Sequence, residues 1–285
     1  MESGSVNGLA SRLASWSPEP VVVRDELDPG PAHALSAVAG LLPVEDSLPP
    51  FWHWVYFLSW PTHDALGMDG HPEHGHFYPP IPDRRRMVAG GRLEVHAPLR
   101  LGVPAERESS LAGVSVKQGR TGELAFVTVR HVISQGGVVG LVEEHDLVYR
   151  QGSPRSGGEV MLASDAPSAD EPWHQQLAPD TRMLFRFSAL TANAHRIHYD
   201  LPYTREVEGF PALVVHGPWQ VLQMLDLVRR HAGDRRVTRA SYRMRSPVFC
   251  GEPVLVAGRP TDGGATLRVA TAREPQHATA EVTFA

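Results

Sequence analysis

The sequence predicts an α+β protein made of two tandem halves, each a curved antiparallel sheet wrapped around a central helix. Three observations predict it: strand-like alternation in both halves, one unusually apolar helix, and an internal repeat. The 285 residues can form two ordinary domains, each with its own core. The expected domains are residues 1–155 and 180–285, and residues 156–179 are the expected linker because they belong to a stretch rich in Ser, Pro, Gly, Ala and Asp.

The first half is expected to begin with a short helix and continue with strands. The segment Pro31–Leu42 is rich in alanine and compatible with a helix. Later segments alternate between apolar and polar residues and are interrupted by glycines, which is typical of strands. The expected strands are Arg92–Ala97, Leu111–Lys117, Glu123–Ile133 and Val138–Tyr149.

The second half is expected to contain a long helix, Pro218–His231, followed by four strands. Only a narrow stripe of this helix is polar, so the rest of the domain must cover most of its surface. A strongly curved antiparallel sheet around one central helix does so, and this is the double hot-dog arrangement when both halves adopt it. The expected strands are Val237–Ser246, Pro253–Arg259, Ala265–Ala272 and His277–Ala285.

An internal repeat supports the division into two halves. A Pro-x-x-x-Gly-x-Pro pattern occurs at Pro98–Pro104 and again at Pro247–Pro253. Each copy follows one expected strand and precedes another, so the two lie at equivalent places. Duplication of one domain explains the repeat most simply.

Composition excludes several classes of protein. With 27 basic and 32 acidic residues the net charge is −5, which argues against a nucleic-acid-binding protein. No apolar stretch approaches the ~20 residues of a transmembrane helix, and the N-terminus lacks a secretory signal. The single cysteine, Cys250, fits a reducing compartment and is expected to be a small buried residue. The expected location is the cytoplasm, with no membrane partner.

The chemically most informative segment is Phe187–Asp200, followed by Gly209–Pro218. The first places titratable groups on a turn, and the second leads into a helix. The unpaired N–H groups of a helix start can bind a thioester carbonyl oxygen as it gains negative charge. Gly217 is the expected donor, because Pro218 has no N–H. Taken alone, the same residues are an ordinary helix-starting turn.

His198 is the expected acid/base, because an imidazole with a pKa near ~6.5 can take a proton from water and return one to the α-carbon. Asn193, five residues earlier, is expected to hold the same water through its amide. A structural role is the alternative for any one of the 15 histidines in the chain.

This segment resembles the signature of the MaoC-like (R)-specific hydratases and dehydratases, Asp-x-Asn-Pro-x-His followed by a His-Gly helix start. His198 falls on the catalytic histidine of that superfamily, and Asn193 falls on its aspartate. The form Asn-x-His195-Arg196-Ile-His-Tyr-Asp200 is similar to one branch, the mesaconyl-CoA and itaconyl-CoA hydratases and the type-two 3-hydroxyacyl-thioester dehydratases.

Three segments of the first half resemble the N-terminal dehydratase-like domain of that branch. They are Pro49–Leu58, Asp69–Pro72 and Arg85–Arg92. The resemblance therefore covers most of the chain from about residue 20. It implies that residues 1–155 form a non-catalytic domain that shapes the acyl pocket, and pairing of sheet edges predicts a homodimer of two such chains.

The resemblance implies a hydro-lyase that reversibly adds water to an enoyl thioester, such as a mesaconyl-CoA-like substrate. It implies no cofactor other than coenzyme A as part of the substrate, and no metal. Two alternatives are a dehydratase for 3-hydroxyacyl chains on a carrier protein, and a non-catalytic acyl-thioester-binding protein that lost its base when Asn193 replaced aspartate. The expected catalytic residues are His198, Asn193, Gly217 and Asp200, the last as the carboxylate that orients His198. The expected substrate-binding residues are His195, Arg196, Tyr199, His216, Trp219, Arg243 and Arg245.

A cluster of histidines and a cluster of arginines are further candidate binding sites. Five histidines lie within 24 positions, but their spacing matches no zinc motif, so we expect a loop that covers the acyl pocket: His53, His63, His71, His74 and His76. Several arginines are candidate contacts for the phosphates of coenzyme A, with a solvated surface as the alternative: Arg84, Arg85, Arg86, Arg239, Arg243 and Arg245.

Overall fold

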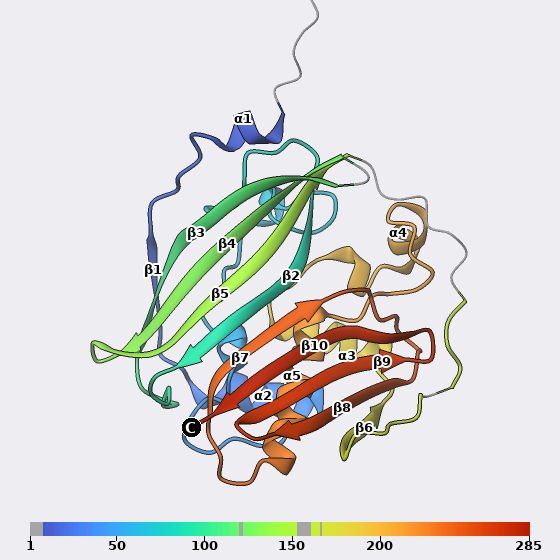
Figure 1. The fold of residues 1–285 in the computed structure, drawn as a ribbon. Coiled ribbons are helices and arrows are strands. Elements are labelled where there is room, and N and C mark those ends of the chain that lie inside the picture. The colour runs from blue at the N-terminus through green and yellow to red at the C-terminus, as the bar shows by residue number, and fades with distance from the viewer. Residues whose placement is uncertain (1–7, 120–121, 153–160, 166) are drawn as a thin grey trace, which may run out of the picture.

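Ten antiparallel strands form one continuous curved sheet in the computed structural model, which describes residues 8–119, 122–152, 161–165 and 167–285 (Figure 1). The strand order is β1-β3-β4-β5-β2-β7-β10-β9-β8-β6. The first half of the chain provides β1 (Val21–Asp25), β2 (Arg84–Val95), β3 (Ala105–Gly119), β4 (Gly122–Gln135) and β5 (Val138–Gln151). The second half provides β6 (Trp173–Leu177), β7 (Val237–Met244), β8 (Val254–Thr261), β9 (Gly264–Thr271) and β10 (Glu274–Phe284).

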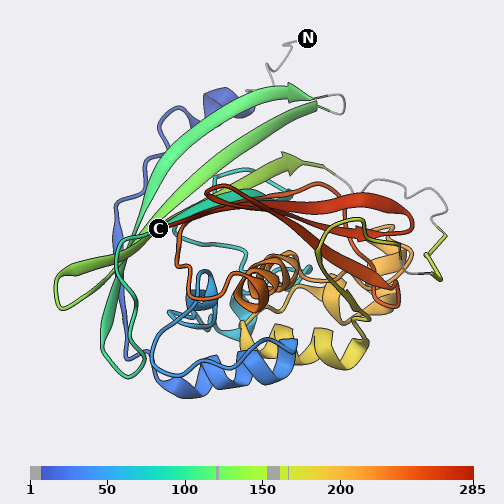
Figure 2. The same cartoon turned by 60° about the horizontal axis from the view of Figure 1, so that its bottom comes forward.

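The three longest helices lie on the same side of the sheet, and α5 lies between the C-terminal strands and the other two (Figure 2). They are α2 (Pro29–Ala39), α3 (Thr181–Leu190) and α5 (Gly217–His231). The shorter helices are α1 (Leu9–Leu13), η1 (Trp52–Val55), η2 (His63–Ala65), η3 (Arg196–His198) and α4 (Leu201–Glu206). None of these described helices has the length and apolar character needed to cross a membrane.

The two halves repeat one topology, which confirms the predicted double hot-dog fold. The first half has the order β1-β3-β4-β5-β2 and the second the equivalent order β6-β8-β9-β10-β7. The two repeated Pro/Gly loops also correspond, because Arg100 pairs with Ser47 in one and Phe249 pairs with Val214 in the other. Pairing of β2 with β7 joins the halves, and Gly90 permits it, since a Cβ there would lie 2.4 Å from the carbonyl oxygen of Tyr242.

The polar stripe of α5 binds the first half of the chain. The amide nitrogen of Gln223 donates to the carbonyl of Ala39 at 2.6 Å, and the carboxylate of Asp226 accepts from the backbone N–H of Leu42 at 2.9 Å. Asp226 is 1% exposed and pairs with two arginines of its own helix. The two hydrogen bonds to Ala39 and Leu42 fix α5 against the end of α2. The two arginines compensate the buried charge of Asp226, which would be costly without a partner.

The structure differs from two of the predicted elements. Among the described residues of the N-terminal half there is no helix as long as α5. After the bridge at Ser47 the buried segment is the short η1, whose Trp52 is almost fully enclosed. The stretch 156–179 is not only a linker, because β6 lies within it and pairs with β8. It escaped prediction because it is a short edge strand with polar residues at its centre. The predicted boundary at residue 155 lies outside the described residues.

Candidate active site

The segment after α3 forms a tight turn that its polar side chains hold. Ala192 has a left-handed backbone (φ 50°), and the side-chain oxygen of Asn193 accepts the backbone N–H of His195 at 3.0 Å. This is the local turn that asparagine side chains commonly make. The amide oxygen of Asn193 therefore shapes the turn, and its assignment to a bound water stays a prediction.

His198 is held by the backbone of the strand-like segment that precedes α5. Its Nδ1 donates to the carbonyl of Val214 at 2.7 Å, and its side chain is buried. Because Nδ1 carries the proton in this bond, Nε2 is the nitrogen with a free lone pair. The prediction that Asp200 orients His198 is wrong. Asp200 caps α4 by accepting the N–H of Tyr203 and pairs with Arg196, as a short acidic side chain at a helix start usually does.

Four imidazoles from three segments contact one another in a row, which we call the histidine stack: His71, His195, His198 and His216. The ring centroids of His71 and His195 are 4.1 Å apart, and those of His198 and His216 are 3.7 Å apart. Between the two pairs, His195 meets His198 edge to face at 5.6 Å. Burial lowers the pKa of His198 to about 4 and also lowers the pKa of the other three. All four rings are therefore neutral at pH 7.

The start of α5 presents polar atoms that have no partner in the described part of the chain. His216 is the N-cap residue, and its Nε2 is hydrogen-bonded with Ser188 at 2.8 Å. Its Nδ1, the indole N–H of Trp219 and the side-chain oxygen of Gln220 are buried without a protein partner. Gly217 is the first helical residue, so its N–H has no acceptor within the helix. Such unpaired groups suit a polar ligand.

A loop from the N-terminal half packs directly on this segment. The carbonyl oxygens of Met68 and Asp69 accept hydrogen bonds from Arg196, at 3.0 and 2.9 Å. Between them and the site, Gly70 approaches so closely that a Cβ would lie 1.8 Å from the carbonyl oxygen of Ala194. The predicted loop over the site is therefore present, and it brings His71 with it.

The other histidines of the predicted cluster lie elsewhere. His53 is buried against Glu143, 2.8 Å away, and the remaining three are exposed: His63, His74 and His76. Ligand atoms of Asp69, His71 and His195 lie within 4.8 Å of one another, close enough to hold a metal ion. The carboxylate of Asp69 already accepts a hydrogen bond from His71 at 3.0 Å, however, and this bond explains their proximity without an ion.

Two predicted substrate-binding residues have structural partners. The guanidinium of Arg196 pairs with Asp200 at 2.7 Å and lies 4.0 Å above the ring of Tyr203. The hydroxyl of Tyr199 donates to the carbonyl of Ala194, and the side chain is largely exposed. Arg196 therefore holds the site together and is not free to bind an anion.

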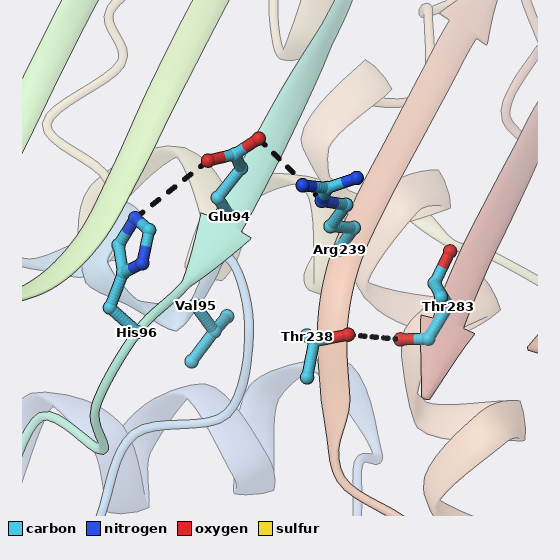
Figure 3. Close-up of a pocket in the computed structure, with 6 residues that line it drawn as sticks. All are labelled: Glu94, Val95, His96, Thr238, Arg239 and Thr283. Atoms are coloured by element: carbon cyan, nitrogen blue, oxygen red, sulfur yellow. Dashed lines mark hydrogen bonds and ion pairs between the residues drawn. The ribbon is translucent and has the colours of Figure 1, made fainter. Parts of the chain in front are cut away.

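The predicted arginine patch is divided between two faces of the sheet. Arg243 and Arg245 are exposed and alternate with Met244, whose side chain would lie 3.3 Å from a Cβ at Gly217, so the two arginines point away from α5. On that outer face a cavity of about 310 Å³ lies over β2 and β7, where Glu94 pairs with His96 and Arg239 (Figure 3). The charge of Arg239 in this cavity is neutralised by the carboxylate of Glu94, which disfavours a phosphate site there.

The pH dependence follows from the neutral histidine stack. As pH falls, a proton occupies Nε2 of His198 only near its lowered pKa of about 4. We therefore expect kcat/KM to stay level as the pH is lowered from 7 through ~6.5, the usual pKa of an imidazole. It should decrease only at lower pH, as the pKa of His198 is approached. The unfolded chain binds more protons in this range, so stability also decreases as pH falls below ~6.5. A pH–rate profile with parallel thermal unfolding checks both; an acid limb centred at or above pH ~6.5 would contradict the burial argument.

Comparison with known proteins agrees with this geometry. Residues 51–250 match the family Hydroxyacyl-thioester dehydratase type 2. The chain is 42% identical over 255 residues to mesaconyl-C(4)-CoA hydratase of Chloroflexus aurantiacus, covering 87% of this chain and 89% of that protein. It is 28% identical over 274 residues to the mitochondrial hydroxyacyl-thioester dehydratase type 2 of Schizosaccharomyces pombe, covering 83% and 89%.

Solved structures share the fold at lower identity. HtdX of Mycobacterium tuberculosis superposes with a TM-score of 0.67 at 18% identity, covering 94% of this chain and all of that chain. A MaoC-like dehydratase of Phytophthora capsici superposes with a TM-score of 0.68 at 12% identity, covering 97% and 98%. At these identities the likeness shows the double hot-dog fold alone.

Two hot-dog halves, with a buried histidine beside a helix start in one of them, define the class of MaoC-like acyl-thioester hydratases and dehydratases. Within that class, the chain belongs to the type 2 hydroxyacyl-thioester dehydratase family. It is an acyl-thioester hydro-lyase, as the sequence predicted.

Proposed function

We propose that this chain hydrates a short, dicarboxylic enoyl-CoA, using His198 and the first turn of α5. One observation carries the proposal: the Nδ1 of His198 is fixed on Val214, so its Nε2 lone pair lies beside the helix start that His216 caps. These contacts support a site in which a neutral acceptor for water and a backbone N–H donor for a carbonyl act together. Hydration of an α,β-unsaturated thioester requires this pair of groups.

The reaction follows from these positions. The thioester carbonyl accepts the N–H of Gly217, and the attacking water donates to Nε2 of His198. As an O–H bond of the water breaks, its oxygen bonds to the β-carbon and the π electrons move to the thioester oxygen. The N–H and the positive end of the α5 dipole stabilise that charge. Transfer of the water's proton to the α-carbon completes the 3-hydroxyacyl product, and the reverse sequence is dehydration.

Two observations support a substrate with a second carboxylate. The relative from Chloroflexus, named for mesaconyl-C(4)-CoA, acts on a thioester that keeps one free carboxylate. Next to the stack, Arg86 donates to the hydroxyl of Tyr78 at 2.8 Å and has no carboxylate partner among the described residues. Opposite Arg86 in the β2–β5 register, the hydroxyl of Tyr149 is buried without a partner. An unpaired guanidinium beside a buried hydroxyl suits a carboxylate.

Of the predicted arginines around β2, Arg86 alone is left for this task. Arg84 donates to the carbonyls of Pro72 and Glu73, and Arg85 pairs with Glu208. The positive charge of Arg86 lowers the pKa of both His71 and His195, so it acts electrostatically on the proposed reaction centre.

Substituting Arg86→Gln tests the substrate class. We expect KM for mesaconyl-CoA to rise about 10- to 100-fold, the loss expected for one charged hydrogen bond. KM for crotonyl-CoA, which has no second carboxylate, should change little. The measurement is the loss of the enoyl ultraviolet absorbance with each substrate, and Arg239→Gln on the outer face is the matched control. Equal effects on both substrates would contradict the carboxylate role.

A second candidate substrate is a 3-hydroxyacyl chain on a carrier protein. The family description and the Schizosaccharomyces relative name hydroxyacyl thioesters without naming coenzyme A. Rates with the same acyl group on coenzyme A and on a carrier protein decide between the two. A kcat/KM at least ten times higher on the carrier would replace the CoA proposal.

A further inference from the structure

The site as described lacks a free carboxylate to hold the attacking water. A water molecule donates two hydrogen bonds, and Nε2 of His198 accepts one. Asn193 stands where the resemblance places an aspartate, and its amide oxygen holds the turn at His195. Asp200, the nearest carboxylate in the sequence, is occupied by Arg196 and the start of α4. The side-chain oxygen of Gln220 is an unpartnered acceptor at the start of α5, but it is neutral. An acceptor that a carboxylate supports must come from another segment.

The loop of the N-terminal half supplies a histidine that a carboxylate holds. Asp69 accepts the Nδ1 proton of His71 at 3.0 Å through one oxygen and the backbone N–H of His71 at 2.9 Å through the other. The side chain of His71 is 14% exposed. With Nδ1 donating to a carboxylate, Nε2 of His71 keeps a free lone pair, the same state that Val214 enforces on His198.

The position of His71 is fixed against the second half of the chain. Its ring lies 4.1 Å from His195, and His195 contacts His198 at 5.6 Å. The backbone bond from Arg196 to Asp69 and the close approach at Gly70 prevent the loop from sliding. His71 and His198 thus flank His195 as parts of one rigid group of side chains.

We propose that the Asp69–His71 pair is the second acid/base of the hydration reaction, replacing the carboxylate that Asn193 does not provide. The inference rests on the proposed function. The water donates one hydrogen bond to Nε2 of His198 and one to Nε2 of His71. His71 takes the proton as the oxygen bonds to the β-carbon, and Asp69 stabilises the imidazolium that forms. His71 then returns the same proton to the α-carbon, so the pair ends as it began.

His71 is better suited than His198 to carry this proton. Four groups face it: Asp69 from its own loop, His195 from the turn, and Arg84 and Arg86 from β2. Burial and the two arginines lower the pKa of His71, and Asp69 raises it. His198 has a carbonyl for a partner and receives no such help from a carboxylate. An imidazolium next to a carboxylate is the more stable of the two.

Two substitutions test the pair. His71→Gln removes the acceptor, and we expect kcat for enoyl-CoA hydration to fall about 10²- to 10⁴-fold with KM nearly unchanged. Asp69→Asn removes the charge and one of the two acceptors, because its single amide oxygen can replace only one of the two carboxylate oxygens that hold His71. We expect a smaller loss of kcat and an acid limb shifted to lower pH, since the imidazolium is no longer stabilised. A purely structural role for Asp69 would leave the pH profile in place.

The double variant and a control complete the test. Asp69→Asn with His71→Gln should be no slower than His71→Gln alone, because the carboxylate acts through the histidine. His74→Gln, an exposed histidine in the same segment, should match the unmodified enzyme. Wild-type kcat in His71→Gln, together with an inactive His198→Ala, would overturn this inference and leave the proposed function intact. Full activity in both would overturn the proposed function as well.

A metal ion at the same residues is the remaining outcome. If the purified enzyme carries one equivalent of metal, and activity is lost with a chelator and restored by that metal, then Asp69, His71 and His195 are ligands and the acid/base role is wrong. We expect no dependence of the rate on chelator.

Discussion

Substituting His198→Ala is expected to lower kcat for enoyl-CoA hydration about 10²- to 10⁴-fold, the range for loss of a side chain that takes part in the proton-transfer step. The imidazole is neutral at pH 7 because burial lowers its pKa to about 4, and its Nδ1 is committed to Val214. Nε2 is thus the only part of the side chain available to the water. Initial rates with mesaconyl-CoA and crotonyl-CoA, followed by enoyl absorbance, measure the loss.

A second variant separates chemistry from folding. His198→Asn keeps an N–H group that can reach the carbonyl of Val214, so it should restore much of the thermal stability lost in the alanine variant while remaining inactive. His174→Ala, at an exposed histidine of β6, is the control and should be fully active. A kcat within ten-fold of wild type in both His198 variants would remove this residue from the mechanism.

Local patterns in the sequence predicted the helix and strands of the second half well. The apolar surface of α5 and the alternation in β10 each follow from side chains a few positions apart. The repeated Pro/Gly loops predicted the duplication for the same reason, because both copies need a glycine at positive φ, 69° at Gly102 and 94° at Gly251. His198 and Gly217 were singled out because each lies in a short segment that resembles the superfamily signature, and their catalytic roles stay predictions.

The partners of those residues could not be predicted locally. The carbonyl of Val214 and the carboxylate of Asp69 carry no signal in the sequence that links them to the histidines near residue 195. Asp200 was assigned to His198 because it is near in sequence, but a carboxylate at a helix start is more strongly bound by the helix N–H groups. The Asp69–Pro72 segment stood out only through its resemblance to known proteins.

The division of labour between the halves is tested by the variants of His71 and Arg86. The resemblance implied a first half that shapes the acyl pocket without chemistry of its own. In the structure its loop brings His71 against His195, so a chemical role for this half is a proposal, and the resemblance's non-catalytic first half stays a prediction. The two halves are joined by β2–β7 pairing and by the buried polar stripe of α5.

Substituting Gly70→Ala is expected to abolish most activity without a change in any titratable group. Gly70 has a φ of 87°, which costs a residue with a side chain about 1–3 kcal/mol. In addition, its Cβ would lie 1.8 Å from the backbone oxygen of Ala194, so the loop must move away. The obstacle is the backbone of Ala194, which cannot move aside as a flexible side chain can. A displacement of about 1 Å in a catalytic group typically lowers the rate about 10²-fold.

Gly102→Ala is the matched control, because Gly102 also has a positive φ, 69°, but a Cβ there would meet nothing within 4 Å. Both variants should lose stability from backbone strain, and only Gly70→Ala should lose about 10²-fold or more in kcat. Thermal unfolding and initial rates of the two proteins side by side measure the difference. If both retain the same kcat, close docking of the loop on Ala194 is not needed for catalysis, and the role of His71 loses its structural basis.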